Sequence, residues 1–220
     1  MTMGWIGGFY RSTIGRKIVM AVSGIVLVVY VIGHMTGNLL AFQGRARLDA
    51  YAHFLQSSAP ILWTVRSVLL LATMLHVHSA WSLTRDARAA RPAGYARREV
   101  LSSTMGSRTM RWGGVLLLVF IVYHLLHFTT GTVHPDFVRG QVYDNLVTGL
   151  SVPAVAVFYL VAMLALALHL SHGVWSLFQT LGVSHPHLER GRRGLAIVLA
   201  IVVPAGFAAI PLAVLLGWLR

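Results

Sequence analysis

The residues best suited to chemistry in this chain are histidines that lie inside long apolar stretches. Four of them, each on a separate stretch, are His34, His76, His124 and His169. An imidazole buried in hydrocarbon is costly, so by default it marks a functional site and needs a partner. Imidazole is a good ligand for iron, and two imidazoles on facing helices can clamp a haem between them. The pattern therefore predicts bis-histidine haem binding.

Three of these four residues have a second histidine close by in the sequence: His78, His127 and His172. His127 shares the face of His124, because residues three apart are neighbours on a helix, and the same spacing applies to His172. His78 lies about 200° around the helix from His76, so both cannot face one haem. We interpret the second histidines as hydrogen-bond partners or packing residues.

The remaining histidines lie in the predicted loops. We expect His134, His185 and His187 to be solvated. His53 lies in an aromatic surface segment, where it serves either as an interfacial anchor or as a contact for a quinone head group.

Composition indicates a membrane protein. Of 220 residues, 56% are hydrophobic and 11% are charged, which suits a bilayer rather than a soluble domain. The net charge of +12 comes from arginines between apolar stretches, where topology and anionic lipid account for them, so we exclude nucleic acid as a partner. The chain has no cysteine, which excludes disulfides, cysteine-ligated iron–sulfur clusters and covalently attached haem.

Five apolar stretches are long enough to cross a bilayer. They cover residues 17–41, 61–86, 110–131, 152–180 and 194–219. The first follows a basic run but lacks a cleavage motif, so we interpret it as an uncleaved span. Residues 42–60 include a short amphipathic surface helix through Leu48, Tyr51, Ala52 and Leu55. The fold prediction is an all-α membrane protein, with five transmembrane helices forming one di-haem bundle over residues 1–220.

Lysine and arginine counts orient the bundle. One side carries 13 of them, in the N-terminal head, the region 85–111 and residues 190–193. The other side carries 4: Arg45, Arg47, Arg139 and Arg220. Cytoplasmic loops are enriched in basic residues, so this imbalance places the N-terminus in the cytoplasm.

Depth along the spans pairs the histidines. His34 and His124 each lie seven residues before the outer end of a span, which is about 10 Å at 1.5 Å per residue. His76 and His169 lie about 15–16 Å from the inner ends of theirs. Two layers follow, an outer pair and an inner pair, offset by about 15 Å along the membrane normal. Gly33 and Gly37 flank His34, and we expect them to let a flat macrocycle approach the backbone.

An ordered set of motifs runs through the chain: SxxGRK (12–17), GHMTGN (33–38), YAHFL (51–55), LHVHSAWSLTR (75–85), YHLLHFT (123–129) and HLSHGVWS (169–176). The set resembles the cytochrome b subunit of succinate dehydrogenase and fumarate reductase, in its single-chain, five-helix, two-haem form (b558 type). The resemblance implies haem iron axial ligands at His34, His76, His124 and His169, paired His34 with His124 and His76 with His169. The choice between His76 and His78 depends on how the motif is aligned. The spacing of four residues from His76 to Ala80 favours His76.

The resemblance also implies the function. The chain would be a multi-pass subunit of the inner (cytoplasmic) membrane, anchoring a flavoprotein and an iron–sulfur subunit of the respiratory chain and the tricarboxylic acid cycle. It would pass electrons through two haems b between the iron–sulfur subunit and membrane quinone, expected to be menaquinone. Dicarboxylate chemistry would occur on the partner subunits, so no catalytic residue is expected on this chain. The basic cytoplasmic loops would form the docking face.

Two alternatives stay open at this point. The first is a cytochrome b subunit of another quinone-linked dehydrogenase, such as formate dehydrogenase or nitrate reductase. The second is a haem-free transporter or proton channel that uses the histidines as a relay. Against the second, the chain shows no internal repeat and no acidic residue in mid-span. The quinone site is open between an outer position near His53, Tyr51 and Arg66 and an inner one near the His76/His169 haem.

Overall fold

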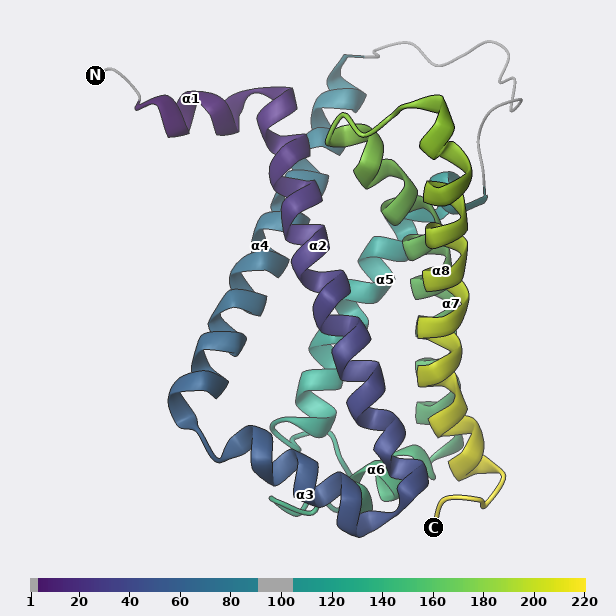
Figure 1. The fold of residues 1–220 in the computed structure, drawn as a ribbon. Coiled ribbons are helices and arrows are strands. Elements are labelled where there is room, and N and C mark those ends of the chain that lie inside the picture. The colour runs from purple at the N-terminus through teal and green to yellow at the C-terminus, as the bar shows by residue number, and fades with distance from the viewer. Residues whose placement is uncertain (1–3, 91–104) are drawn as a thin grey trace.

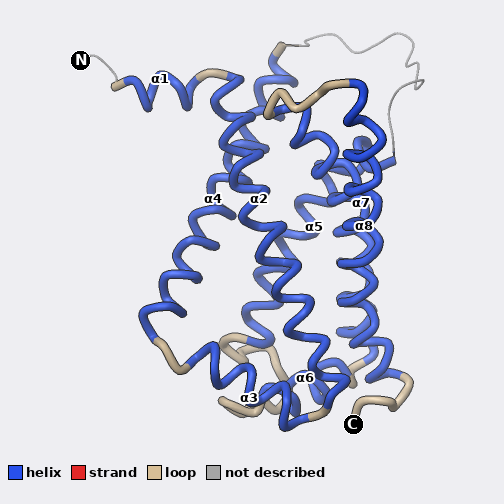
Figure 2. Tube along the Cα trace, in the orientation of Figure 1, coloured by secondary structure: helices blue, strands red, loops and turns tan. Residues whose placement is uncertain are grey.

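A computed structural model describes residues 4–90 and 105–220 of the chain. Within these residues, every regular element is a helix (Figure 1, Figure 2). Residues 91–104 of the predicted basic loop, including Arg91, Arg97 and Arg98, lie outside the described residues.

Five of the described helices are long and apolar enough to cross a membrane. They are α2 (Thr13–Asn38, continued by the 3₁₀ helix η1, Leu39–Gln43), α4 (Ala59–Ala89), α5 (Met105–Phe128), α7 (Pro153–Thr180) and α8 (Pro186–Leu215). The predicted all-α membrane fold is confirmed.

Local sequence explains where these helices begin. α4, α7 and α8 each have a proline in the first turn, where the helix needs no backbone N–H from that residue. α2 begins after Ser12, whose hydroxyl accepts a hydrogen bond from the Gly15 N–H at 2.9 Å and so satisfies one free donor. Proline and a capping hydroxyl therefore mark the start of four of the five spans.

The start of α8 differs from the prediction. The predicted fifth span begins at residue 194, so residues 184–193 before it were expected to be a loop, but the helix already begins at Pro186. Arg192 is 6% exposed, bonds to the Val183 carbonyl oxygen at 2.7 Å, and is ion-paired with Glu189 one turn earlier. The basic stretch is helical because the buried Arg192 guanidinium pairs with Glu189 in the same helical turn and with the Val183 carbonyl oxygen in the preceding loop.

Three shorter helices lie at the ends of the bundle (Figure 1). α3 (Arg45–Gln56) and α6 (Val142–Leu150) lie across one end, and α1 (Trp5–Arg11) extends sideways at the other. α3 confirms the predicted amphipathic surface helix, whereas α6 was not predicted. The chain turns into α3 at Gly44, whose φ of +91° favours glycine.

Polar contacts join α3 to α6 across about ninety residues of sequence. Asp49 Oδ1 accepts a hydrogen bond from the Tyr143 N–H at 2.9 Å, which satisfies a free donor in the first turn of α6. Arg45 forms an ion pair with Asp144. Leu48 of α3 is buried in one core cluster with residues of α6. The two helices therefore close this end of the bundle as one unit.

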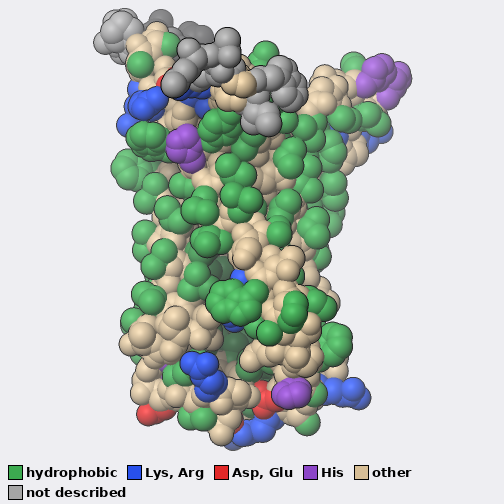
Figure 3. Space-filling model, turned by 90° about the vertical axis from the view of Figure 1, so that its left-hand side faces the viewer, with side chains coloured by type: hydrophobic (Ala, Val, Ile, Leu, Met, Phe, Trp, Pro, Cys, Tyr) green, Lys and Arg blue, Asp and Glu red, His purple; other side chains and the backbone are tan. Residues whose placement is uncertain are grey.

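The best-packed part of the bundle is the contact between α7 and α8, where buried Leu170 and Val174 meet Ala196, Ala200 and Val203. α4 and α5 instead present many apolar side chains outward, and Figure 3 shows such side chains over the middle of one face, with most Lys and Arg toward its two ends. A bilayer accommodates this distribution, because acyl chains cover the apolar band.

Candidate functional site

His34 of α2 and His124 of α5 face one another near the end of the bundle that α3 and α6 close. Their ring centroids are 5.8 Å apart and their planes are 80° apart. Tyr30 stacks on His34 at 5.3 Å with planes 11° apart, and Phe207 of α8 lies 5.7 Å from the same ring. We call His34 and His124 the outer pair. The structure brings together the two residues that depth had paired.

His76 of α4 and His169 of α7 form a second pair, the inner pair. Their ring centroids are 6.2 Å apart and their planes 58° apart. His76 Nδ1 lies 3.0 Å from the Met20 carbonyl oxygen, which can only accept, so Nδ1 carries the proton and Nε2 has a free lone pair. His169 Nδ1 is buried and has no hydrogen-bond partner among the described residues. Each pair therefore brings together two imidazole rings from different helices.

Two helices show how far apart the two pairs lie along the bundle. A Cβ at Gly24 of α2 would lie 3.4 Å from His76 Cε1, and His34 follows ten residues later. A Cβ at Gly114 of α5 would lie 3.9 Å from His169 Cε1, and His124 again follows ten residues later. Ten residues of helix span about 15 Å, so the pairs occupy two levels with the predicted offset.

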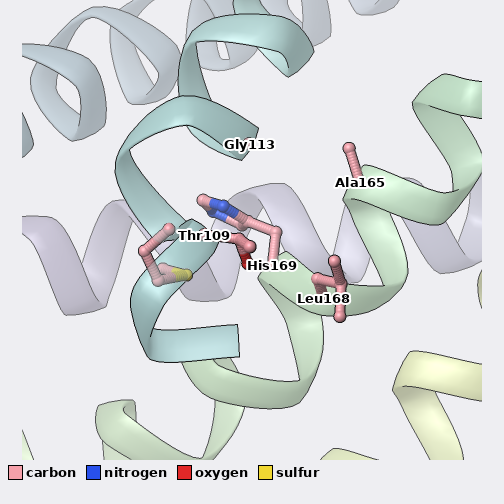
Figure 4. Close-up of a pocket in the computed structure, with 6 residues that line it drawn as sticks. Thr109, Gly113, Ala165, Leu168 and His169 are labelled. Carbon is pink, nitrogen blue, oxygen red and sulfur yellow. The ribbon is translucent and has the colours of Figure 1, made fainter. Parts of the chain in front are cut away.

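Apolar hollows adjoin the inner pair. One of about 340 Å³ lies between α2 and α4, with Ser23 in its lining, and the Ser23 hydroxyl is 3.4 Å from His76 Nδ1. A smaller one of about 60 Å³ lies between α5 and α7, lined by Thr109, Gly113 and His169 among others (Figure 4). The His169 ring points toward α5 beside Gly113 in this view, where the absent side chain leaves room. One hollow therefore lies near each histidine of the inner pair.

The other histidines on the spans separate from the two pairs. His78 is exposed on the other side of α4, where its Nδ1 lies 2.6 Å from the Tyr10 hydroxyl, so His76 is the member of α4 that faces His169. His172 is half-buried and packs 6.1 Å from the Trp175 ring. Among the loop and surface histidines, His53, His185 and His187 are exposed. The exposure of the last two agrees with the prediction that they are solvated.

His134 corrects an expectation. It was predicted to be solvated, but it is 8% exposed. Its Nε2 donates to the Asn145 carbonyl oxygen at 2.8 Å, and its Nδ1 accepts from the Asp136 N–H at 3.1 Å. This burial could not be predicted from the sequence, because α6, which contains Asn145, covers the loop only in the folded chain.

Gly37 corrects a second expectation. A Cβ at this position would lie 2.5 Å from Cε1 of Tyr51, so the glycine makes room for the tyrosine of α3. A Cβ at Gly33 would meet no atom within 4 Å. The glycine that lies against a paired histidine on α2 is Gly24, beside His76.

Tyr159 of α7 is a site residue that sequence reasoning missed. Its hydroxyl lies 3.3 Å from His124 Nδ1 and 3.0 Å from His127 Nδ1. A hydroxyl inside an apolar span usually forms a hydrogen bond to another helix. The position of Tyr159 inside such a span was the only sequence signal for its role. The partner itself depends on the packing of α7 against α5.

Comparisons with known proteins identify the family of the chain. Residues 87–209, more than half of the chain, match the family described as the succinate dehydrogenase/fumarate reductase transmembrane subunit. The chain is also similar to the succinate dehydrogenase cytochrome b558 subunit of Bacillus subtilis, with 24% identity over 159 residues that cover 71% of this chain and 73% of the relative. No solved structure matches the chain. With five helices long and apolar enough to span a membrane and this family match, the chain belongs to the succinate dehydrogenase/fumarate reductase transmembrane subunits and is a multi-pass membrane protein.

Proposed function

We propose that this chain binds two haems b and passes electrons between the iron–sulfur subunit of its complex and membrane quinone. The outer pair would hold one haem and the inner pair the other. The observation that carries the proposal is that four helices bring four histidines into two pairs inside an apolar bundle, with ring centroids 5.8 Å and 6.2 Å apart.

The spacing of the rings supports this assignment. A metal–imidazole nitrogen bond is about 2 Å, and the nitrogen lies about 1 Å from the ring centre, so two axial imidazoles have centroids about 6 Å apart. The measured centroid distances are 5.8 Å for the outer pair and 6.2 Å for the inner pair. The spacing of the rings therefore leaves room for an iron between them at both levels. Haem b supplies a one-electron redox couple when it is bound.

The residues around each pair would fix the rings and their protons. A ring that binds iron through Nε2 must carry its proton on Nδ1. The Met20 carbonyl oxygen accepts that proton from His76, and the Tyr159 hydroxyl stands 3.3 Å from Nδ1 of His124. Such outer-sphere partners orient a ligand ring and tune its basicity.

The charge distribution supports a cytoplasmic N-terminus in the inner membrane. Exposed cations gather at the end of the bundle where α1 lies: Arg11, Lys17, Arg88, Arg111 and Arg190. This basic end would dock the iron–sulfur subunit, which would place the inner pair nearer the incoming electrons and the outer pair nearer the opposite membrane surface. Quinone, expected to be menaquinone, would exchange electrons with this chain, and the flavoprotein would carry out the succinate–fumarate chemistry.

Family membership argues against the first alternative, because the chain matches the succinate dehydrogenase/fumarate reductase transmembrane subunits. The second alternative, a haem-free histidine relay, predicts a protein without haem, so a haem count separates it from the proposal.

A haem count on single-histidine variants tests the proposal. The complex is purified, its reduced-minus-oxidised spectrum is recorded, and haem is counted as the pyridine haemochrome for His34→Ala, His76→Ala, His124→Ala and His169→Ala. We expect two haems b in the wild type, with the same haem lost or made high-spin in both variants of one pair. His78→Ala is the matched control on α4 and should keep both haems, because His78 faces away from the inner pair. A colourless protein, or one haem affected equally by all four substitutions, would contradict the proposal.

A further inference from the structure

A hydrogen-bonded triad lies beside the outer pair and joins two transmembrane helices. The Tyr159 hydroxyl of α7 is 3.3 Å from His124 Nδ1 and 3.0 Å from His127 Nδ1, both on α5. His127 is fully buried and Tyr159 is 8% exposed. His124 is a proposed ligand, whereas the other two residues have no part in holding a haem.

The chemistry of the three groups gives the hydrogen bonds one direction. If His124 binds iron through Nε2, as proposed above, its Nδ1 carries the proton and donates it to Tyr159 Oη. The tyrosine proton is then free to be donated to His127 Nδ1, which must be an acceptor. The order is His124 Nδ1–H to Tyr159 Oη–H to His127 Nδ1. Each bond polarises the next, so the His127 acceptor makes the tyrosine oxygen a better acceptor for His124.

Aromatic rings hold the tyrosine hydroxyl in place. Phe120 meets the Tyr159 ring edge-on at 4.9 Å, and Phe128 does so at 5.8 Å. Phe128 also lies 4.1 Å from the His127 ring. A Cβ at Gly149 of α6 would lie 2.7 Å from His127 Nε2, so α6 closes the remaining side. The hydroxyl therefore has little freedom to turn to another partner.

Packing alone does not account for His127. Its Nε2 is buried and has no hydrogen-bond partner among the described residues, although buried polar groups are normally paired. An apolar side chain of similar volume would fill the same space without an unpaired nitrogen. The polar contact that His127 does make is the one to Tyr159, so the pattern points to a role exerted through the tyrosine.

The inner pair is supported differently. His76 Nδ1 donates to a backbone carbonyl oxygen, that of Met20, and His169 Nδ1 has no partner among the described residues. The two levels therefore give their candidate ligands different hydrogen bonds. Hydrogen bonds to an axial histidine change how strongly it donates electrons to the metal, and this is one of the means by which a protein sets a haem potential.

We propose that Tyr159 and His127 are positioning residues that hold the ring of His124 and lower the reduction potential of the outer haem. The inference rests on the proposed haem-binding function. An acceptor at Nδ1 increases the electron density on the ligating nitrogen, which favours ferric over ferrous iron. Removing the acceptor raises the potential of this haem and leaves the inner haem unchanged.

Redox titration of four variants in the purified complex tests the proposal. Each haem is followed by its absorbance, and the outer haem is identified as the one lost in His124→Ala. Tyr159→Phe removes the hydroxyl and should shift the reduction equilibrium of the outer haem on the order of tenfold, about 59 mV upward for a one-electron couple. His127→Leu should shift it in the same direction but less. His127→Asn places an amide oxygen near the former Nδ1 and should restore the wild-type value.

Tyr123→Phe is the matched control. Tyr123 is the neighbour of His124 on α5 and lies 5.4 Å from the His127 ring, but its hydroxyl makes no hydrogen bond within the part of the chain described. This variant should leave both potentials unchanged. The proposal is overturned if Tyr159→Phe retains both haems at wild-type potentials, or if both haems shift equally. It is also overturned if His127→Asn and His127→Leu behave alike. A complex without haem would overturn the proposed function itself, which distinguishes the two failures.

Discussion

Replacing Gly149 with alanine would place a methyl group between two buried histidines. The new Cβ would lie 2.7 Å from Cε1 and Nε2 of His127 and 2.8 Å from His134 Nε2. Ordinary contacts at such a position begin at 3.4 Å, so both rings would have to move. Neither is free to do so, because His127 is fully buried and His134 is held by Asn145 and Asp136.

The cost follows from these distances. Overpacking a filled interior costs about 1–3 kcal/mol, and the better helix propensity of alanine returns at most about 1 kcal/mol. We expect Gly149→Ala to lose about 1–2 kcal/mol of stability and to lower Tm by roughly 2–8 °C. Displacing His127 should also weaken its hydrogen bond to Tyr159, so the outer haem should shift in the same direction as in Tyr159→Phe.

Thermal unfolding of the complex in detergent, followed by tryptophan fluorescence, measures the first effect. Gly173→Ala is the control, because Gly173 lies within α7 and its Cβ would meet no atom within 4 Å. That change should leave Tm unchanged or raise it. A Gly149→Ala protein as stable as Gly173→Ala, with an unchanged outer haem, would refute the inferred contact between α6 and His127.

Two further predictions concern the end of the bundle that α3 and α6 close. Gly37→Ala should lower the free energy of unfolding by about 1–3 kcal/mol, measured as a lower Tm, because the new Cβ would lie 2.5 Å from Cε1 of Tyr51. A smaller loss in a Tyr51→Ala background would verify the contact, and an equal loss would argue against it. Asp49→Ala should lower the free energy of unfolding by about 0.5–2 kcal/mol, because it removes the acceptor for the Tyr143 N–H. Asp49→Asn keeps an oxygen at this position and should lower it less. Equal melting temperatures for the two variants would show that this hydrogen bond contributes little.

Much of the fold could be predicted because the relevant signals are local. A bilayer span needs about twenty consecutive apolar residues, and this requirement located five helices from composition alone. The predicted span 152–180 differs from α7 by one residue at its start. The depths of the four histidines also follow from position along a helix, and they gave the two pairs that the structure brings together. Their role as haem ligands stays a prediction.

The differences arise where a residue's surroundings come from distant parts of the chain. α6 is short, so its hydrophobic face is visible only once α3 and α7 are beside it. The expected loop at 184–193 is helical because Arg192 is buried against Val183 and Glu189. The prediction that His134 is exposed was wrong for the same reason, since the residues that cover it lie in α6.

The sequence by itself determined the class of the fold, the approximate positions of the five spans and the relative depths of the paired histidines, because hydropathy and helical rise are properties of a single segment. Only the tertiary structure decided that His76 rather than His78 faces His169, and that Tyr159 reaches both His124 and His127. These features depend on how each helix is rotated about its axis, which is set by side chains on neighbouring helices. The sequence of a single segment does not determine this rotation.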